Sequence, residues 1–338
     1  MDKSLRKIKT YYLGCLIKSP KLNENRSFEF LEKSILFFIE NVRPSYEGIT
    51  IKLLNFTPSE QNMTFFDKLI LLVNEENVKY HNIFLHVSLD SYKISNSIRE
   101  RLSQNQICWD TSFSLEKINA KQLSGYYSIK NLSDYNNKGV TVTYDPDNSS
   151  YYEIFNKLYQ IAYGYPITLK SLNKSFYRKN TKDFIKDFSS FLSILYNQLM
   201  NYEFGMADSF LAGNNYLGNV IKTVLHNNEK VFRDSDYEYS PCLDSSRNIY
   251  YNSRMASERF LVGSISKGID QEKVDSIISE LTNNKTICPY CPINSICPKL
   301  ECKNNFIELH RKCNSMAIDF VKNIQAQNKT VFEYLKYK

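Results

Sequence analysis

Hydrophobic and polar positions alternate with two different periods along the first half of the chain. Short apolar runs are typical of buried strands, and the amphipathic stretches between them, with apolar residues three or four positions apart, favour helices. The predicted strands are residues 8–16, 49–56, 82–88, 106–113, 139–144 and 166–169. The helices predicted between and after them are residues 28–42, 64–73, 95–102, 130–135 and 151–162.

This order of strands and helices favours an α/β fold. Strands that are joined by helical crossovers run parallel, and right-handed crossovers would curl six such units into a partial (β/α)6 TIM-like barrel. An open, doubly wound sheet is the alternative that the pattern leaves.

The second half of the chain has a different pattern. Long helices are predicted at residues 184–204 and 207–225, and from about residue 228 the pattern becomes irregular. A hairpin at residues 248–252 and 259–265, a helix at 271–281, a cysteine-rich stretch and a last helix at 314–335 are predicted there. We therefore predict two domains, a barrel with trailing helices at residues 1–228 and a cysteine-rich domain at residues 229–338.

Composition and charge narrow the class of protein. Hydrophobic residues make up 42% of the chain, enough for a core, yet no stretch approaches the roughly 18 unbroken apolar residues of a membrane helix. Only eight residues separate Lys9 from Lys18, and no small-residue cleavage site follows, so a strand is predicted there in place of a signal peptide. We expect a soluble, cytoplasmic protein without membrane contact. The net charge of +7 is spread along the chain, which permits nucleic-acid binding but is typical of an ordinary surface.

Cysteines carry the candidate chemistry. The chain has eight, and without a secretion signal such residues act as ligands or buried thiols more often than as disulfides. Cys15 and Cys108 lie singly in apolar runs, whereas the stretch that begins with C-x2-C in the C-terminal part holds five: Cys288, Cys291, Cys297, Cys302 and Cys313. Prolines after the first three stiffen the turns. Four thiolates suit zinc and iron–sulfur clusters alike, and five exceed one tetrahedral site. One of them, or Cys242 upstream, therefore belongs to a second centre or is spare.

This spacing resembles the SPASM domain, the cysteine-rich extension of radical SAM enzymes that modify peptides and proteins. Its signature is C-x2-C-x5-C-x3-C followed by a further cysteine, and Cys302 comes one residue late. The resemblance implies that one [4Fe–4S] cluster, with zinc as the alternative, is held by Cys288, Cys291, Cys297 and Cys313. Cys302 and Cys242 would be the remnant of a second site, since Asn252 stands where another cysteine is expected.

The six βα units resemble the radical SAM partial barrel. That family holds its catalytic cluster with C-x3-C-x2-C after the first strand, and here Cys15 is followed by Ser19 and Leu22 at the other two positions. The glycine-rich turn expected after the second strand reads NFTP, residues 55–58, without glycine. The resemblance therefore implies descent from a radical enzyme without S-adenosylmethionine as cofactor and without the radical reaction.

A SPASM domain on a barrel without that motif resembles the SPASM-domain peptide maturase of grasp-with-spasm systems. The resemblance implies a role in maturing a ribosomally synthesised peptide, with the precursor peptide and an ATP-grasp ligase as partners. Two alternatives remain. One is a zinc- or cluster-stabilised interaction protein that binds nucleic acid. The other is an enzyme with chemistry of its own at the barrel mouth, where His86, Asp90, Trp109 and Asp110 lie on or after predicted strands.

Overall fold

The computed structural model describes residues 12–18, 24–54, 56–90, 94–103, 107–130, 136–145, 149–159, 165–171, 181–213, 215–225, 239–253, 256–283 and 307–337. They form two compact units. The first unit comprises Met1–Asp110, Ser128–Asn137 and Tyr239–Ile277, and the second comprises Thr111–Tyr127, Lys138–Glu238 and Ile278–Lys338. The boundary predicted at residue 228 divides the chain into two continuous stretches, whereas each compact unit combines three separate stretches. The boundary therefore stays a prediction.

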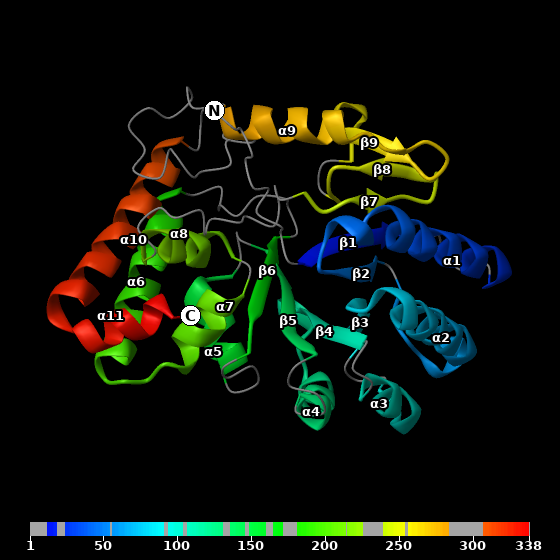
Figure 1. Cartoon of the computed structure of the whole chain (residues 1–338). Helices are drawn as coiled ribbons and strands as arrows, with labels where there is room; N and C mark the ends of the chain where they lie inside the picture. The colour runs from blue at the N-terminus through cyan, green and yellow to red at the C-terminus, as the bar shows by residue number, and fades with distance from the viewer. Residues whose placement is uncertain are drawn as a thin grey trace. The chain divides into compact units, whose positions relative to one another are not determined.

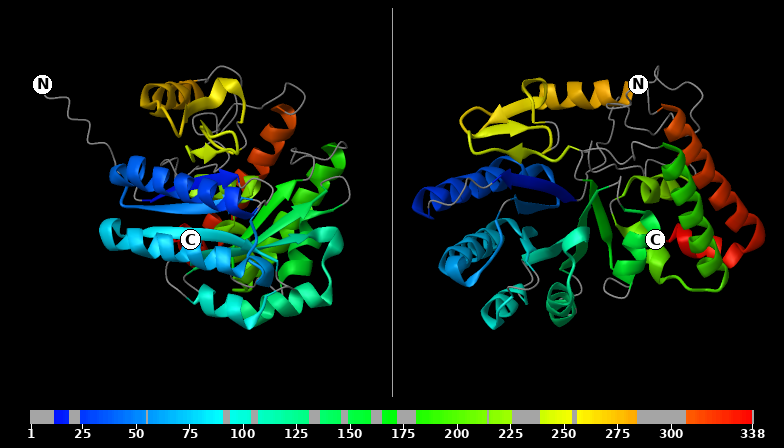
Figure 2. Two further views of the ribbon diagram at one scale, coloured as in Figure 1. Left: turned by 90° about the vertical axis from the view of Figure 1, so that its right-hand side faces the viewer. Right: turned by 180° about the vertical axis from the view of Figure 1, so that it is seen from behind.

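The first unit is built on parallel strands covered by helices. Strands β1 (Tyr12–Lys18), β2 (Gly48–Leu54) and β3 (Ile83–Leu89) are neighbours, and β4 (Ile107–Ser114) follows β3. Helices α1 (Glu24–Asn41) and α2 (Met63–Tyr80) pack against each other and against these strands, as Figures 1 and 2 show from several sides. Helix α3 (Asn96–Leu102) connects β3 to β4.

Alternating burial along β2 and β3 defines the two faces of this sheet. Ile49, Ile51 and Leu53 of β2 are buried, whereas the residues between them are partly exposed, and β3 repeats the pattern. Because successive side chains of a strand point to opposite faces, the apolar set faces the helices and the other set forms a second, more polar face. We call this second face the inner face.

A small antiparallel extension continues the first unit beyond β1. Strand β7 (Cys242–Leu243) pairs in parallel with β1, and β8 (Asn248–Tyr250), β9 (Leu261–Ser264) and β10 (Gly268–Ile269) follow in antiparallel order. The backbone N–H of Leu16 donates to the carbonyl of Pro241 at 2.9 Å, which anchors the junction. Helix α9 (Gln271–Asn283) begins directly after β10. The hairpin predicted from the sequence is therefore confirmed.

The second unit joins two parallel strands to a group of helices. It holds β5 (Asn137–Tyr144, from Lys138 on), β6 (Ile167–Ser171), α4 (Ala120–Ile129, up to Tyr127), α5 (Tyr151–Tyr159), α6 (Thr181–Met200), α7 (Gly205–Ala212), α8 (Tyr216–Leu225), α10 (Ile307–Gln327) and α11 (Lys329–Lys336). Helix α10 packs against α6, α8 and α11 (Figure 1). Phe155, Phe191 and Phe210 form the centre of this core, with ring centroids 5.0 to 5.3 Å apart.

All six strands of the barrel prediction are present, but two helix predictions need correction. Helix α4, at Ala120–Ile129, was not predicted, and the helix expected at residues 130–135 stays a prediction because residues 131–135 lie outside the described ones. The helix expected at 207–225 is two helices, separated at Gly213. The last predicted helix is also two, since Asn328 caps α11 by accepting a hydrogen bond from the Val331 N–H at 3.1 Å.

Candidate functional site

Three charged or titratable side chains come together on the inner face of the first unit. Lys52 of β2, His86 of β3 and Asp110 of β4 lie on three successive strands, and Lys52 is the register partner of His86. All three lie near the middle of their strands, two or more residues before the C-terminal end. In barrels of parallel strands, catalytic and binding side chains are found at the carboxyl side of the strands, so these three residues lie deeper in the sheet than such side chains usually do. We call these residues the inner-face triad.

One carboxylate oxygen holds the inner-face triad together. Lys52 Nζ donates to Asp110 Oδ2 at 2.5 Å, and His86 Nε2 lies 3.3 Å from the same oxygen. The side chains of Lys52, His86 and Asp110 are 19%, 12% and 6% exposed. The carboxylate is thus the most deeply buried member, and the ammonium lies nearest to solvent.

The protonation of Asp110 follows from this geometry. Burial by itself raises the pKa of the Asp110 carboxyl, because it disfavours the charged form. The hydrogen bond and charge of His86, and then those of Lys52, outweigh burial and hold the pKa well below its ordinary value. Asp110 therefore stays ionised at every physiological pH.

The second oxygen of this carboxylate differs from the first. Asp110 Oδ1 is buried, and no hydrogen-bond donor reaches it from the described part of the chain. A buried carboxylate oxygen without a donor loses the hydrogen bonds that water would supply. The arrangement is therefore suited to accept a hydrogen bond from a group that enters the inner face.

The sequence pointed to part of this site. His86 and Asp110 were expected near the barrel mouth, and the structure brings them into contact. Trp109 is fully buried and occupies the alternate position of β4, so its side chain faces away from the inner face. Asp90 follows the end of β3 and belongs to neither of the two contacts that define the triad. Lys52 was missed, although its polar position in an otherwise apolar strand was a usable signal.

Cys15 lies within β1 and not in the loop that follows it. Its side chain is 0% exposed and lies on the same face of β1 as those of Leu13 and Ile17, which are also buried, so it faces the helices. Burial raises the pKa of this thiol far above its ordinary range. Cys15 is thus a buried strand residue, as the sequence predicted.

The structure describes two of the six predicted metal ligands. Cys242 on β7 and Cys313 on α10 are buried free thiols, one in each compact unit, and burial raises their pKa values to about 11 and about 12. Within the described ranges, no three His, Cys, Asp or Glu side chains gather as they would around a metal ion. The other four predicted ligands, which lie outside those ranges, are Cys288, Cys291, Cys297 and Cys302.

The chemistry of these two thiols is compatible with a metal or cluster. Neither is used in a disulfide, so both sulfurs are available as ligands. Only the thiolate binds a metal, so a bound group would have to displace protons that burial holds firmly in place. Cys242 and Cys313 are therefore possible donors only for a group whose binding outweighs the cost of removing those protons.

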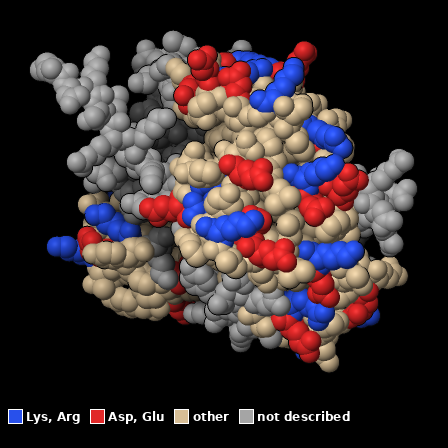
Figure 3. Space-filling view, turned by 45° about the vertical axis from the view of Figure 1, so that its right-hand side comes forward, with Lys and Arg blue, Asp and Glu red and all other residues tan. Residues whose placement is uncertain are grey.

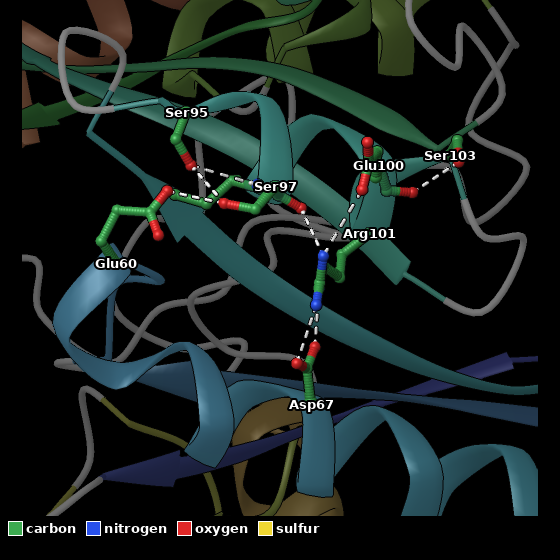
Figure 4. Close-up of polar contacts among 8 residues, drawn as sticks. Glu60, Asp67, Ser95, Ser97, Glu100, Arg101 and Ser103 are labelled. Carbon is green, nitrogen blue, oxygen red and sulfur yellow. Dashed lines mark hydrogen bonds and ion pairs between the residues drawn. The ribbon is translucent and has the colours of Figure 1, made fainter.

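A polar network fixes the helix that follows β3. Arg101 of α3 donates through Nε and Nη2 to the two carboxylate oxygens of Asp67 on α2, at 2.7 and 2.8 Å (Figure 4). Ser95 caps the start of α3, and the Ser97 hydroxyl donates to Glu60 at 2.6 Å. These contacts hold α3 against α2 and the turn after β2.

The chain is similar in structure to anSMEcpe, a SPASM-domain radical SAM enzyme. Native anSMEcpe with bound AdoMet aligns with 96% of this chain and 100% of its own, with a TM-score of 0.64 and 14% identity. The fold is mixed α/β with a central parallel sheet, and it matches a radical SAM-like partial barrel. The same enzyme with AdoMet and the Cp18Cys peptide aligns with this chain at a TM-score of 0.64 and 15% identity, covering 96% and 100% of the two chains.

The similarity concerns the fold alone. No protein-family model matches the sequence, and no curated protein is similar to it in sequence. The predicted fold class is confirmed. The shared fold does not establish the activity of the chain, because one fold supports many functions. Among the described residues, every helix is too short or too polar to span a membrane.

Proposed function

We propose that the chain acts in the maturation of a ribosomally synthesised peptide, as a cytoplasmic protein that binds the precursor peptide and an ATP-grasp ligase. In this proposal it carries out no radical reaction and takes no S-adenosylmethionine. The observation that carries the proposal is the place of Cys15, buried in β1 on the side of the helices. A cluster that cleaves S-adenosylmethionine needs three thiolates in the loop after this strand, where Ser19 and Leu22 stand.

A peptide ligand is supported by the kind of protein that shares the fold. Structures of anSMEcpe hold the Cp18Cys peptide and, at a TM-score of 0.62 and 16% identity over 96% of this chain and 99% of that one, the Kp18Cys peptide. Charge supports a peptide over nucleic acid. On the face shown in Figure 3, basic and acidic residues are interspersed without a continuous basic stripe.

The cysteine-rich part has a structural role in this proposal. Cys288, Cys291, Cys297 and Cys313 hold a [4Fe–4S] cluster, with zinc as the alternative, and Cys302 and Cys242 are the remnant of a second site. A bound cluster or metal adds its binding energy to the stability of the segment that supplies its ligands. Its contribution is then to form a binding surface, and not to transfer electrons to a substrate.

Anaerobic purification with iron, sulfide and zinc analysis tests the chemical half of the proposal. We expect one metal centre per chain and, with a strong reductant and S-adenosylmethionine, no 5′-deoxyadenosine above the level of a Cys15→Ala control. Production of 5′-deoxyadenosine that depends on Cys15 would overturn the claim that radical chemistry is absent. If zinc is the sole metal found, the cysteine-rich part binds zinc and not a [4Fe–4S] cluster.

Co-purification tests the partner half of the proposal. The tagged chain is mixed with the ATP-grasp ligase and with the small precursor peptide encoded beside it, each added separately. We expect at least one of them to be retained at a salt concentration of about 0.15 M, where weak contacts between exposed charges are screened. Retention of neither would refute the role in peptide maturation.

A further inference from the structure

The inner-face triad has features of a ligand-binding site that the proposed function does not by itself explain. We propose that Lys52, Asp110 and His86 bind a neutral amide group, and that a primary carboxamide is the preferred form. This inference deepens the proposed function and rests on it for one point, namely that the carboxamide belongs to a bound peptide, as an Asn or Gln side chain or an amidated end.

Charge selects the class of ligand. Lys52 and Asp110 form an ion pair at 2.5 Å, so their charges cancel in a site where both side chains are largely buried. A cationic ligand at Asp110 Oδ1 would be repelled by the nearby ammonium, and an anionic ligand at Lys52 would be repelled by the carboxylate. A neutral ligand avoids both penalties and avoids the cost of burying a new charge.

Hydrogen bonding narrows the class further. Asp110 Oδ1 is a buried acceptor that no donor from the described residues reaches, so the ligand must supply an N–H or O–H. The Lys52 ammonium has three N–H bonds and gives one to Asp110 Oδ2, so it can also donate to an oxygen of the ligand. The site therefore offers an acceptor and a donor side by side.

The shape of the amide distinguishes two sources. A primary carboxamide carries an N–H and a C=O on the same edge, so it can meet Asp110 Oδ1 and Lys52 Nζ together. A trans peptide group carries them on opposite edges and can meet only one of the two. We therefore expect a carboxamide to bind more tightly than a backbone amide.

The strands give this site the rigidity that recognition requires. Each member comes from a different strand of one sheet, and Lys52 and His86 are held in register by the pairing of β2 with β3. Donors and acceptors on strands keep their positions better than those on loops. The three side chains also point to the same side of the sheet, since they occupy the inner-face positions of their strands.

NMR titration of the full-length protein tests the proposal. The ring signals of His86, identified by their loss in His86→Gln, are followed at pH 8 and constant ionic strength while acetamide, N-methylacetamide, acetate or methylammonium is added. We expect saturable shifts with acetamide, weaker binding of N-methylacetamide, and no saturable shift with either ion. Saturation by acetate or methylammonium at the same concentrations, or none by acetamide, would overturn the proposal.

Substitution of Lys52 tests the charge argument. In Lys52→Met the carboxylate is no longer neutralised, so we expect acetamide to bind at least tenfold more weakly and methylammonium to bind in its place. Lys52→Arg keeps the charge and must still reject methylammonium. Lys33→Met, which removes an exposed lysine paired with Glu29 at 2.6 Å, is the matched control and must behave as the parent. Unchanged selectivity in Lys52→Met would refute the charge argument.

The two proposals fail in different ways. If the precursor peptide is retained equally well by the parent and by Lys52→Met, the inner-face triad is not its binding site and the role in maturation stands. If acetamide saturates the site but no peptide or ligase is retained, the carboxamide site stands and the role in maturation falls.

Discussion

Asp110 is the residue that connects the polar side chains of the inner face. It lies 58 positions after Lys52 and 24 after His86, yet all three meet at one carboxylate oxygen. His86 and Asp110 could be singled out from the sequence because a histidine and an aspartate are unusual inside apolar strands. Lys52 also stands out as a charged residue in a largely apolar strand, but its pairing with these two could not be predicted, because strand register depends on the whole sheet.

Replacing Asp110 should destabilise the fold. In Asp110→Asn the Lys52 ammonium keeps its buried position but loses its counter-charge, which costs more than the ion pair contributes. We expect the free energy of unfolding to fall by about 2 to 3 kcal/mol in urea denaturation. Glu29→Gln, which breaks an exposed pair with Lys33, is the control and should change it by no more than about 0.5 kcal/mol. Equal effects of the two substitutions would contradict the burial argument.

Acid should remove the contribution of Asp110. Its pKa is lower in the folded protein than the ordinary value of about 4, so the unfolded chain binds the proton first. The stabilisation is complete above about pH 5 and is lost as the pH falls below about 4. The stability difference between the parent and Asp110→Asn, measured by urea denaturation at each pH, should therefore shrink between about pH 5 and pH 2. A difference independent of pH would argue against a lowered pKa.

Two buried cysteines provide a matched test of the metal assignment. Cys15 and Cys313 are both fully buried, but only Cys313 is a predicted ligand. We expect Cys313→Ala to lose the bound metal or cluster, and Cys15→Ala to keep it with a loss of about 1 kcal/mol of stability from the small cavity. Metal analysis and urea denaturation of both variants measure this. Loss of the metal in Cys15→Ala would mean that Cys15 is a ligand after all.

At the scale of elements, the sequence predicted strands better than helix ends. The strands are short apolar runs with breaks on both sides, and all six were placed. The helix predictions missed the breaks at Gly213 and Asn328, because apolar spacing continues across both positions. Such breaks are decided by packing and capping, which depend on residues far away in the sequence.

Gly213 is one position where packing alone demands glycine. It follows α7 with an ordinary backbone conformation, but a Cβ there would lie 1.9 Å from the carbonyl oxygen of Ile167 on β6. Gly213→Ala should therefore lower the free energy of unfolding by about 2 kcal/mol or more. Gly14→Ala in β1 is the control, since its nearest contact would be the Ser240 hydroxyl at 3.5 Å, and thermal unfolding should shift little. A similar loss in both variants would contradict the packing argument.

At the scale of the molecule, the similarity to known proteins lies in the fold, and the similarity in sequence is low. Identity to anSMEcpe is 14%, and no family model matches, yet the alignment covers 96% of the chain. The alternation of strands and helices sufficed to predict the barrel. Each strand or helix buries one face, and this burial requires only apolar residues at the right positions, not particular residues. Ligand sets need particular residues, and the expected C-x3-C-x2-C pattern has only one match here, Cys15 in β1.

Removing the metal should destabilise the whole protein. Burial raises the pKa values of Cys242 and Cys313 to about 11 and about 12, so the metal-free thiols are protonated at neutral pH and metal binding must release those protons. A metal that binds the folded protein and not the unfolded chain adds its binding energy to stability. We expect chelation under anaerobic conditions to lower the thermal midpoint by several degrees, and metal retention to weaken as the pH falls.

Cys288→Ala supplies the control for this experiment. It lacks a ligand of the predicted cluster, so its midpoint should equal that of the chelated parent and should not fall further on chelation. Calorimetry of the four samples, each with its metal content measured, separates metal loss from unfolding by the chelator itself. A parent that loses its metal without a change in midpoint would show that the cysteine-rich part binds a metal that the fold does not need, and its role in forming a binding surface would have to be given up.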